Sequence, residues 1–323
     1  MSARELRSTQ SSIGDCSTPT LLVTGRSGFV GQHVLRYLQG ETGLAWRLLA
    51  DAPHDLLMPE SLDDWLADAR PSAVIHLAGQ TFVPDSFRNP AQTLQVNLLG
   101  TLNLLQALKR HGFQGTFLYV SSGDIYGQVP VEHLPITEAY LPRPRNPYAV
   151  SKLAAEHLCL QWAFSEPDWR IIVARPFNHA GPGQAGNFLL PDMARQLIRV
   201  RLGLQPPRLR VGDVDVSRDF LDVRDVVQAY FQLLEHGRSG EVYNVCSGAE
   251  QNVRELIMQM ADLAEVNVSL EQDPSRLRRA EQRRVYGCSE KLRRHTGWQP
   301  QITITTTLHD VLRDWEERDS QQQ

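Results

Sequence analysis

Short apolar runs alternate with longer amphipathic segments along the first half of the chain. Each run is short enough for a buried strand. The runs lie at 20–23, 46–50, 72–79, 115–123 and 171–176. Between them, apolar residues recur at helical spacing, as in VGQHVLRYLQ, near 59–69 and across 91–110. The alternation predicts an α/β fold with a doubly wound parallel sheet, whose sites lie at the carboxyl ends of the strands.

The pattern changes after residue 176. A loop rich in Gly, Pro and Asn is followed by amphipathic segments near 190–203 and 252–265, and 276–295 is rich in arginine. The run EVYNVCSG has the pattern of a strand that returns to the first sheet. We therefore predict a dinucleotide-binding domain and a smaller, discontinuous substrate domain after a floppy N-terminal extension. The expected bounds are 1–18 for the extension, 19–176 with a strand near 241–247 for the first domain, and 177–240 with 248–316 for the second.

Composition excludes several classes of function. The chain has 323 residues, 41% of them hydrophobic, which is enough to bury a large core. A formal charge of −4 gives no reason to expect a nucleic acid or an acidic membrane as partner. Cys16, Cys159, Cys246 and Cys288 show no metal-ligand spacing, and no apolar run approaches the roughly 20 residues of a membrane span. We expect a cytoplasmic protein with reduced thiols and no metal.

Three glycines mark the first turn from strand to helix. Gly25, Gly28 and Gly31 lie in TGRSGFVG, directly after a strand and at the start of a helix. Such glycines let the backbone approach a pyrophosphate, which then sits at the positive end of the helix. The spacing differs from Gly-x-Gly-x-x-Gly, so an ordinary glycine turn is the competing interpretation.

The cofactor's 2′-phosphate preference stays open at this level. Asp51 lies about 20 residues after Gly31, where a carboxylate would bind the ribose hydroxyls of NAD and repel a 2′-phosphate. Arg26 could instead assist a 2′-phosphate, although a solvated arginine is the simpler interpretation. Pro53 leaves the register of this segment undecided.

The stretch from Ser121 to Lys152 carries the candidate chemistry. Tyr148 and Lys152 are four residues apart in a helix-forming segment, so their side chains share one helix face. A cation beside the phenol would lower a pKa that starts near 10. Ser122, at the end of a predicted strand, can present a hydroxyl to the same oxygen. Tyr148 is therefore a candidate general acid/base, against the alternative of a half-buried tyrosine on an amphipathic helix.

Six stretches of the sequence together resemble the extended short-chain dehydrogenase/reductase family. They are TGRSGFVG, HLAGQ, VSSGDIYG, YAVSK, ARPFNHAGPGQ and SRDFLDVRDV, in this order. The resemblance covers roughly residues 20 to 315, and the combination is very specific. It implies a Rossmann-type fold that binds a nicotinamide cofactor.

Within the family, three stretches are most similar to reductases of GDP-4-keto-6-deoxy sugars: FRNPAQTLQVNLLGTLNLLQALK, RNPYAVSKLAAE and EVYNVCSG. The resemblance implies NADPH- or NADH-dependent reduction of the C4 ketone of GDP-4-keto-6-deoxy-D-mannose to GDP-D-rhamnose. It also implies a homodimer in which the helices near 91–110 and 147–163 pair between subunits.

The resemblance assigns roles to individual residues. Tyr148 would protonate the C4 oxygen, Lys152 would hold the nicotinamide ribose, and Ser122 would hydrogen-bond the carbonyl. The implied cofactor-binding residues are Gly25, Gly28, Phe29, Val30, Gly31, Asp55, Leu56, Leu77, Ala78, Gly79, Tyr148, Lys152 and Phe177. The implied substrate-binding residues are Ser122, Asp124, Asn178, Arg218, Arg278 and Glu281. The two arginines would clamp the diphosphate, against the alternative of a solvated basic surface, and the choice between Arg278 and Arg279 for the second position stays open.

One departure from the family bears on the reaction. Nucleotide-sugar 4,6-dehydratases of the family place a glutamate two residues before the Tyr-Gly pair, with a polar acid beside it. Here these positions hold Asp124 and Gly123, which favours simple hydride delivery. A 4,6-dehydratase or a 4-epimerase remains the alternative enzyme. A catalytically silent nucleotide-binding protein is the alternative from another class, but it would need the glycine turn alone.

Overall fold

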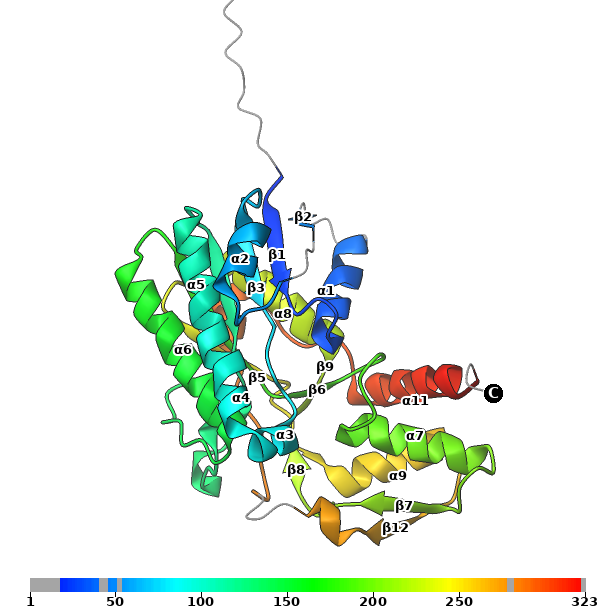
Figure 1. Ribbon diagram of the computed structural model, residues 1–323. Coiled ribbons are helices and arrows are strands. Elements are labelled where there is room, and N and C mark those ends of the chain that lie inside the picture. Colours follow the sequence, from blue (N-terminus) through cyan, green and yellow to red (C-terminus); the bar gives the residue numbers. More distant parts are fainter. Residues whose placement is uncertain (1–17, 41–45, 51–53, 278–281, 321–323) are drawn as a thin grey trace, which may run out of the picture.

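A six-stranded parallel sheet forms the centre of the protein, with strand order β10-β5-β4-β3-β1-β2 (Figure 1). The computed structural model describes residues 18–40, 46–50, 54–277 and 282–320. Most of the predicted extension, Cys16, Asp51, Pro53, Arg278 and Glu281 lie outside these ranges. The strands are β1 (Thr20–Thr24), β2 (Arg47–Leu48), β3 (Ala73–His76), β4 (Thr116–Val120), β5 (Arg170–Pro176) and β10 (Val242–Val245). Each pairing between neighbours is parallel, which confirms the predicted doubly wound sheet.

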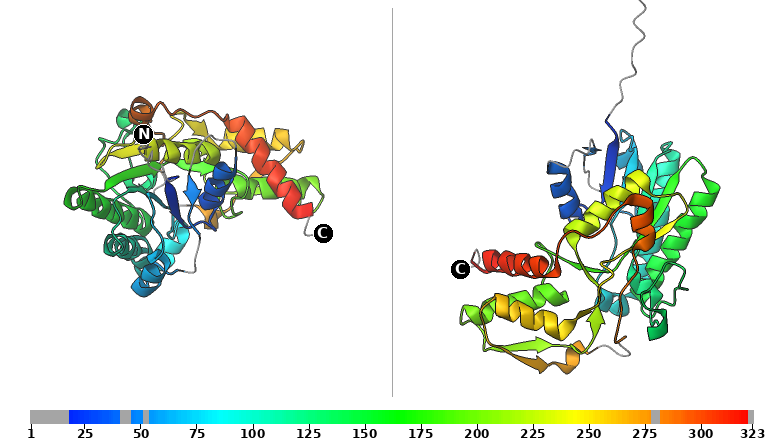
Figure 2. Two further views of the ribbon diagram at one scale, coloured as in Figure 1. Left: turned by 90° about the horizontal axis from the view of Figure 1, so that it is seen from above. Right: turned by 180° about the vertical axis from the view of Figure 1, so that it is seen from behind.

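Helices cover both faces of this sheet because alternate strand residues point to opposite sides (Figure 2). On β1, Leu21 and Val23 pack into one buried cluster, whereas Leu22 packs into another. The first cluster includes side chains of α1 (Phe29–Gln39), α8 (Val223–His236) and α10 (Glu290–Thr296). The second includes side chains of α2 (Pro59–Leu66), α5 (Gly100–Arg110) and α6 (Pro147–Ser165).

The predicted helix across 91–110 is interrupted. It consists of α4 (Pro90–Leu94), a π-helical turn η1 (Gln95–Leu99) and α5. The turn contains buried Asn97, whose amide Nδ2 donates to the Gln80 carbonyl at 2.9 Å and to Ser151 Oγ at 2.8 Å. These bonds join the loop after β3 to the helix that carries Tyr148. Such π-turns are often found at functional sites.

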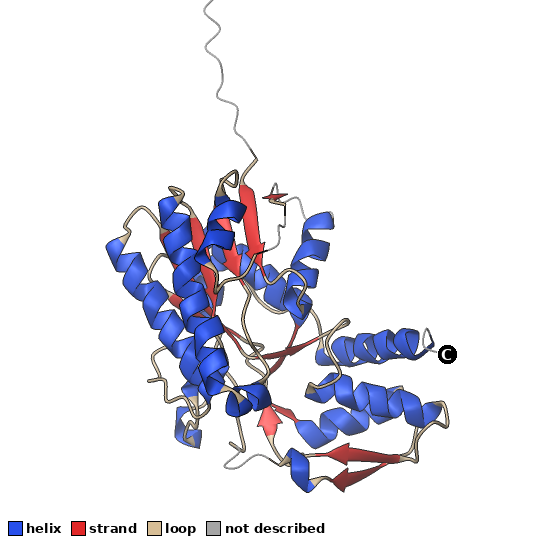
Figure 3. Ribbon diagram, in the orientation of Figure 1, coloured by secondary structure: helices blue, strands red, loops and turns tan. Residues whose placement is uncertain are grey.

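A second group of elements has its own core, beyond the carboxyl end of β1 (Figure 3). It comprises α7 (Leu189–Arg201), α9 (Val253–Leu263), α11 (Ile304–Ser320), and the paired strands β7 (Arg208–Val211) and β12 (Ser269–Gln272). Short pairs link the two groups: β6 (Asn178–Ala180) with β9 (Phe220–Asp222), and β8 (Ser217–Arg218) with β11 (Gln251–Asn252). The remaining helical segments are α3 (Val83–Arg88), η2 (Gly123–Tyr126), η3 (Val131–His133) and η4 (Pro274–Arg276). The predicted functional residues that directly follow β1, β3, β4 and β5 lie at the carboxyl ends of these strands.

Candidate active site

Two glycines at the turn between β1 and α1 occupy positions where a side chain would clash with backbone atoms. Gly25 has a φ of +72°, and a Cβ there would lie 2.8 Å from the backbone nitrogen of Ala78. A Cβ on Gly31 would lie 2.3 Å from the Gly25 carbonyl oxygen. Gly28 caps the start of α1, so the positive end of this helix faces the turn. The geometry fits the predicted approach of a pyrophosphate to the backbone.

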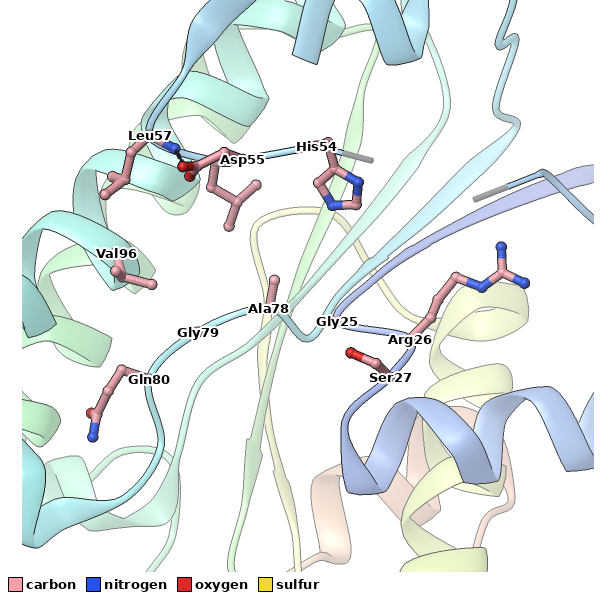
Figure 4. Close-up of a pocket in the computed structure, with 11 residues that line it drawn as sticks. Gly25, Arg26, Ser27, His54, Asp55, Leu57, Ala78, Gly79, Gln80 and Val96 are labelled. Atoms are coloured by element: carbon pink, nitrogen blue, oxygen red, sulfur yellow. Dashed lines mark hydrogen bonds between the residues drawn. The ribbon is translucent and has the colours of Figure 1, made fainter. Parts of the chain in front are cut away.

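A cavity of about 620 Å³ lies beside this turn (Figure 4). Figure 4 shows Arg26 and Ser27 on one side of it and Val96 and Gln80 on the other. The predicted cofactor residues that line it are Gly25, Asp55, Leu56, Ala78 and Gly79. Its other lining residues, which the sequence analysis did not assign to a site, are Ser27, His54, Leu57, Gln80 and Val96, and the cavity also includes Arg26. The sequence could have indicated Gln80 as a lining residue, because it directly follows Gly79 in the HLAGQ stretch.

Hydrogen bonds hold two of the segments that line the cavity. Asp55 Oδ1 accepts from the backbone nitrogen of Leu57 at 2.8 Å, so this carboxylate stabilises its own loop. Arg26 Nη1 donates to the Leu49 carbonyl at 3.0 Å, directly after β2. The arginine side chain therefore reaches the end of the second strand, where a dinucleotide fold places the adenosine ribose.

Tyr148 lies in the first turn of α6 and is 9% exposed. Burial raises the pKa of its phenol to about 12, a hydrogen bond with Ser122 acts in the opposite direction, and the Asp124 charge raises it further. The predicted lowering of this pKa is therefore wrong. A protonated phenol is the form that can donate a proton to a developing alkoxide.

Lys152 explains the difference. Its ammonium lies over the Tyr119 ring, 4.8 Å from the ring centroid, rather than acting on the neighbouring phenol. Lys152 is 5% exposed, and burial lowers its pKa to about 8, while Cys159 and Glu156 act in the raising direction. Helical spacing brings Lys152 to the correct face, but the packing of its flexible side chain decides where the charge lies.

Ser122 is oriented by its own turn. Its Oγ accepts a hydrogen bond from the backbone nitrogen of Asp124 at 3.1 Å, so the hydroxyl proton can be donated elsewhere. The hydrogen bond that lowers the Tyr148 pKa joins the same side chain to the phenol. Ser122 and Tyr148 are therefore brought together, as the sequence predicted.

A buried polar network supports this pair. Arg175 Nε donates to Glu156 Oε2 at 3.1 Å, and Arg175 Nη1 donates to the Tyr126 hydroxyl at 2.7 Å. Tyr126 in turn donates to Asn244 Oδ1 at 2.7 Å. The four side chains come from α6, β5, η2 and β10, so the network ties the segments that carry Ser122 and Tyr148 to the sheet.

Three further predicted residues are Phe177, which was assigned to the cofactor, and Asn178 and Arg218, which were assigned to the substrate. Phe177 is 5% exposed and packs against Gly123, where an added Cβ would lie 3.0 Å from the ring. Asn178 begins β6 and is exposed. Arg218 Nη1 donates to the carbonyls of Ser217 at 2.8 Å and Gln282 at 2.9 Å, so this arginine braces the segment that follows residue 281.

Disulfides, metal-binding groups and membrane-spanning helices are absent from the described part of the chain. Cys159, Cys246 and Cys288 are free thiols. No group of three or more His, Cys, Asp or Glu side chains in the described ranges could hold a metal ion. None of the helices formed by these residues has the length and apolar content needed to cross a bilayer.

Comparison with known proteins gives close matches over nearly the full length. GDP-6-deoxy-D-mannose reductase of Pseudomonas aeruginosa is 61% identical over 303 residues, which is 93% of this chain and 98% of the relative. GDP-6-deoxy-D-talose 4-dehydrogenase of Aggregatibacter actinomycetemcomitans is 28% identical over 275 residues, covering 84% of this chain and 89% of that protein.

Solved structures of similar enzymes share the fold of this chain. The structure of RMD from Pseudomonas aeruginosa complexed with NADPH has a TM-score of 0.89 at 60% identity, covering 93% of this chain and 100% of that one. A Thermus thermophilus UDP-glucose 4-epimerase in complex with NAD has a TM-score of 0.80 at 30% identity, with coverage of 92% and 98%. The family model described as GDP-mannose 4,6 dehydratase matches residues 51–311. The chain therefore belongs to this family of extended short-chain dehydrogenase/reductases.

Proposed function

We propose that this protein is an NADPH-dependent reductase that converts the C4 ketone of GDP-4-keto-6-deoxy-D-mannose into the alcohol of GDP-D-rhamnose. The observation that carries the proposal is the hydrogen bond between Ser122 and Tyr148, in a fold whose first strand-to-helix turn has glycines at positions where a side chain would clash with backbone. We infer the substrate from GDP-6-deoxy-D-mannose reductase, to which this chain is 61% identical.

The side chains divide the work of a ketone reduction. NADPH, when bound at the glycine turn, supplies the hydride. Tyr148 donates the proton to the C4 oxygen, and Ser122 holds that oxygen by a second hydrogen bond. Lys152 holds the nicotinamide ribose through its ammonium group. Phe177 packs against Gly123, which directly follows Ser122.

Arg26 supports the choice of NADPH. Its guanidinium reaches Leu49, after the second strand, where the 2′-phosphate of NADP would extend from the adenosine ribose. A planar guanidinium is well suited to phosphate oxygens. The relative solved with NADPH agrees with this preference.

The test is the absorbance of reduced nicotinamide with purified protein. We expect rapid oxidation of NADPH with GDP-4-keto-6-deoxy-D-mannose, and slower oxidation of NADH. GDP-mannose with NADP⁺ is the second arm of the same assay. Formation of a keto sugar in that arm, with no reductase activity in the first, would replace the proposal by the dehydratase alternative.

Lys152 gives the reductase a defined alkaline limit. Its pKa of about 8 means that the ammonium is charged below that pH and neutral above it. The dissociation constant for NADPH should therefore be constant near pH 7 and rise about tenfold by pH 10, since a hydrogen bond from a charged group contributes about 1.5–3 kcal/mol. Nicotinamide fluorescence titrations measure this. The Lys152→Met variant should bind NADPH weakly at all these pH values. An equally steep rise of its dissociation constant with pH would contradict the role of Lys152.

We further propose that the protein is cytoplasmic and that its second group of elements binds the nucleotide sugar. We also propose that it forms a homodimer. Exposed side chains line one face of α6, including Val150 and Phe164, the latter 90% exposed. Leu99 is exposed on η1. Apolar side chains on these neighbouring helices would be buried if two subunits packed together through them. The mass of the 36.4 kDa chain in solution, measured by sedimentation, tests this pairing.

A further inference from the structure

Asn146 makes two hydrogen bonds with one side chain. Its Oδ1 accepts from the backbone nitrogen of Ala149 at 2.7 Å, which caps the start of α6. Its Nδ2 donates to Asp124 Oδ2, also at 2.7 Å. Asp124 belongs to the turn η2, which lies 22 residues earlier in the chain. A single amide therefore connects the two segments that carry the candidate catalytic hydroxyls.

Both ends of this connection lead directly to a reacting group. Tyr148 follows Asn146 by two residues, in the first turn of the capped helix. On the other side, the backbone nitrogen of Asp124 donates to Ser122 Oγ at 3.1 Å. The capped helix sets the height of Tyr148, and the Asp124 backbone sets the direction of the Ser122 hydroxyl. A change in the Asn146–Asp124 bond would therefore alter the distance between these two hydroxyls.

We propose that Asn146 is a positioning residue, which holds Ser122 and Tyr148 in register through its bridge to Asp124. The idea rests on the proposed ketone reduction, in which both hydroxyls must reach one oxygen. The same bridge keeps one oxygen of the Asp124 carboxylate occupied. Displacing reacting groups by as little as 1 Å can lower a rate by about 100-fold, so the loss should be in kcat rather than in KM.

Two substitutions separate the bridge from the helix cap. Serine and aspartate cap helices about as well as asparagine, and aspartate also suits the positive helix end. Neither side chain can donate a hydrogen bond to Asp124. In Asn146→Ser the hydroxyl is too short to reach the Asp124 carboxylate, and in Asn146→Asp a second carboxylate faces the first. If capping were the whole role, Asn146→Asp would match the wild type and equal or exceed Asn146→Ser in activity and in thermal stability.

The bridge predicts the opposite order. We expect Asn146→Ser to lower kcat for the keto sugar about tenfold and Asn146→Asp to lower it more, with KM changed less than about twofold. Asn146→Asp should also melt at a lower temperature than Asn146→Ser, because like charges repel. The order of the two melting temperatures is measured without substrate, so it tests this inference alone. Turnover of the keto sugar by the wild-type protein, measured in parallel, tests the proposed function.

A double-mutant cycle assigns the effect to the pair. In an Asp124→Ala background the Asn146→Ser substitution should cost little further kcat, because the partner is already gone. An Asn146→Ser loss of the same size in both backgrounds would overturn the bridge. So would an Asn146→Asp variant as active and as stable as the wild type.

Discussion

Replacing Tyr148 by phenylalanine is expected to lower kcat by about 10³-fold or more while leaving NADPH affinity within about threefold. The substitution removes the phenol that donates the proton and changes almost no volume. It also removes the hydrogen bond with Ser122, which leaves that hydroxyl without its partner on α6. Stopped-flow absorbance at the nicotinamide band gives the rate, and fluorescence titration gives the affinity.

A matched tyrosine provides the control. Tyr140 packs against Tyr126 and His133 outside the proposed reaction centre, so Tyr140→Phe should keep kcat within about twofold. Near-normal turnover by Tyr148→Phe would mean that another group protonates the product. Loss of NADPH binding in that variant would mean that the phenol acts on the cofactor instead.

The largest expected effect on folding is at the buried ion pair. Glu156 and Arg175 are 0% and 5% exposed, and Glu156→Ala would leave the guanidinium buried without its carboxylate. Breaking one partner of a buried pair typically destabilises a protein by about 3–5 kcal/mol. Urea unfolding of the variant, followed by circular dichroism, measures this loss in the free energy of unfolding.

The chain offers an exposed pair of the same kind for comparison. Arg110 Nη2 lies 2.9 Å from Asp63 Oδ2, but these side chains are 46% and 38% exposed. Exposed pairs contribute about 0–1 kcal/mol, so Asp63→Ala should cost little. Equal losses from Glu156→Ala and Asp63→Ala would show that burial does not control the strength of the first pair.

Local patterns in the sequence were sufficient to predict the framework. Strand and helix periodicities depend on neighbouring residues, and they predicted the central parallel sheet and the return of the 241–248 run as β10. The crowding at Gly31 is also local to the turn, whereas that at Gly25 comes from the backbone of Ala78 in the loop after β3. The helix bearing Tyr148 and Lys152 followed from its helix-forming residues, and the proximity of Ser122 followed from its place at the end of β4.

The chemistry of the site depended on contacts between distant segments. The phenol's pKa is raised because surrounding chains bury it, and the Lys152 charge is drawn over Tyr119 from β4. The π-turn at Asn97 accompanies bonds to Gln80 and Ser151, on two other segments. No local pattern contains these partners. Residue types and spacings thus indicate which groups could react, whereas packing sets their protonation and orientation, because burial and long-range hydrogen bonds exist only once the chain has folded.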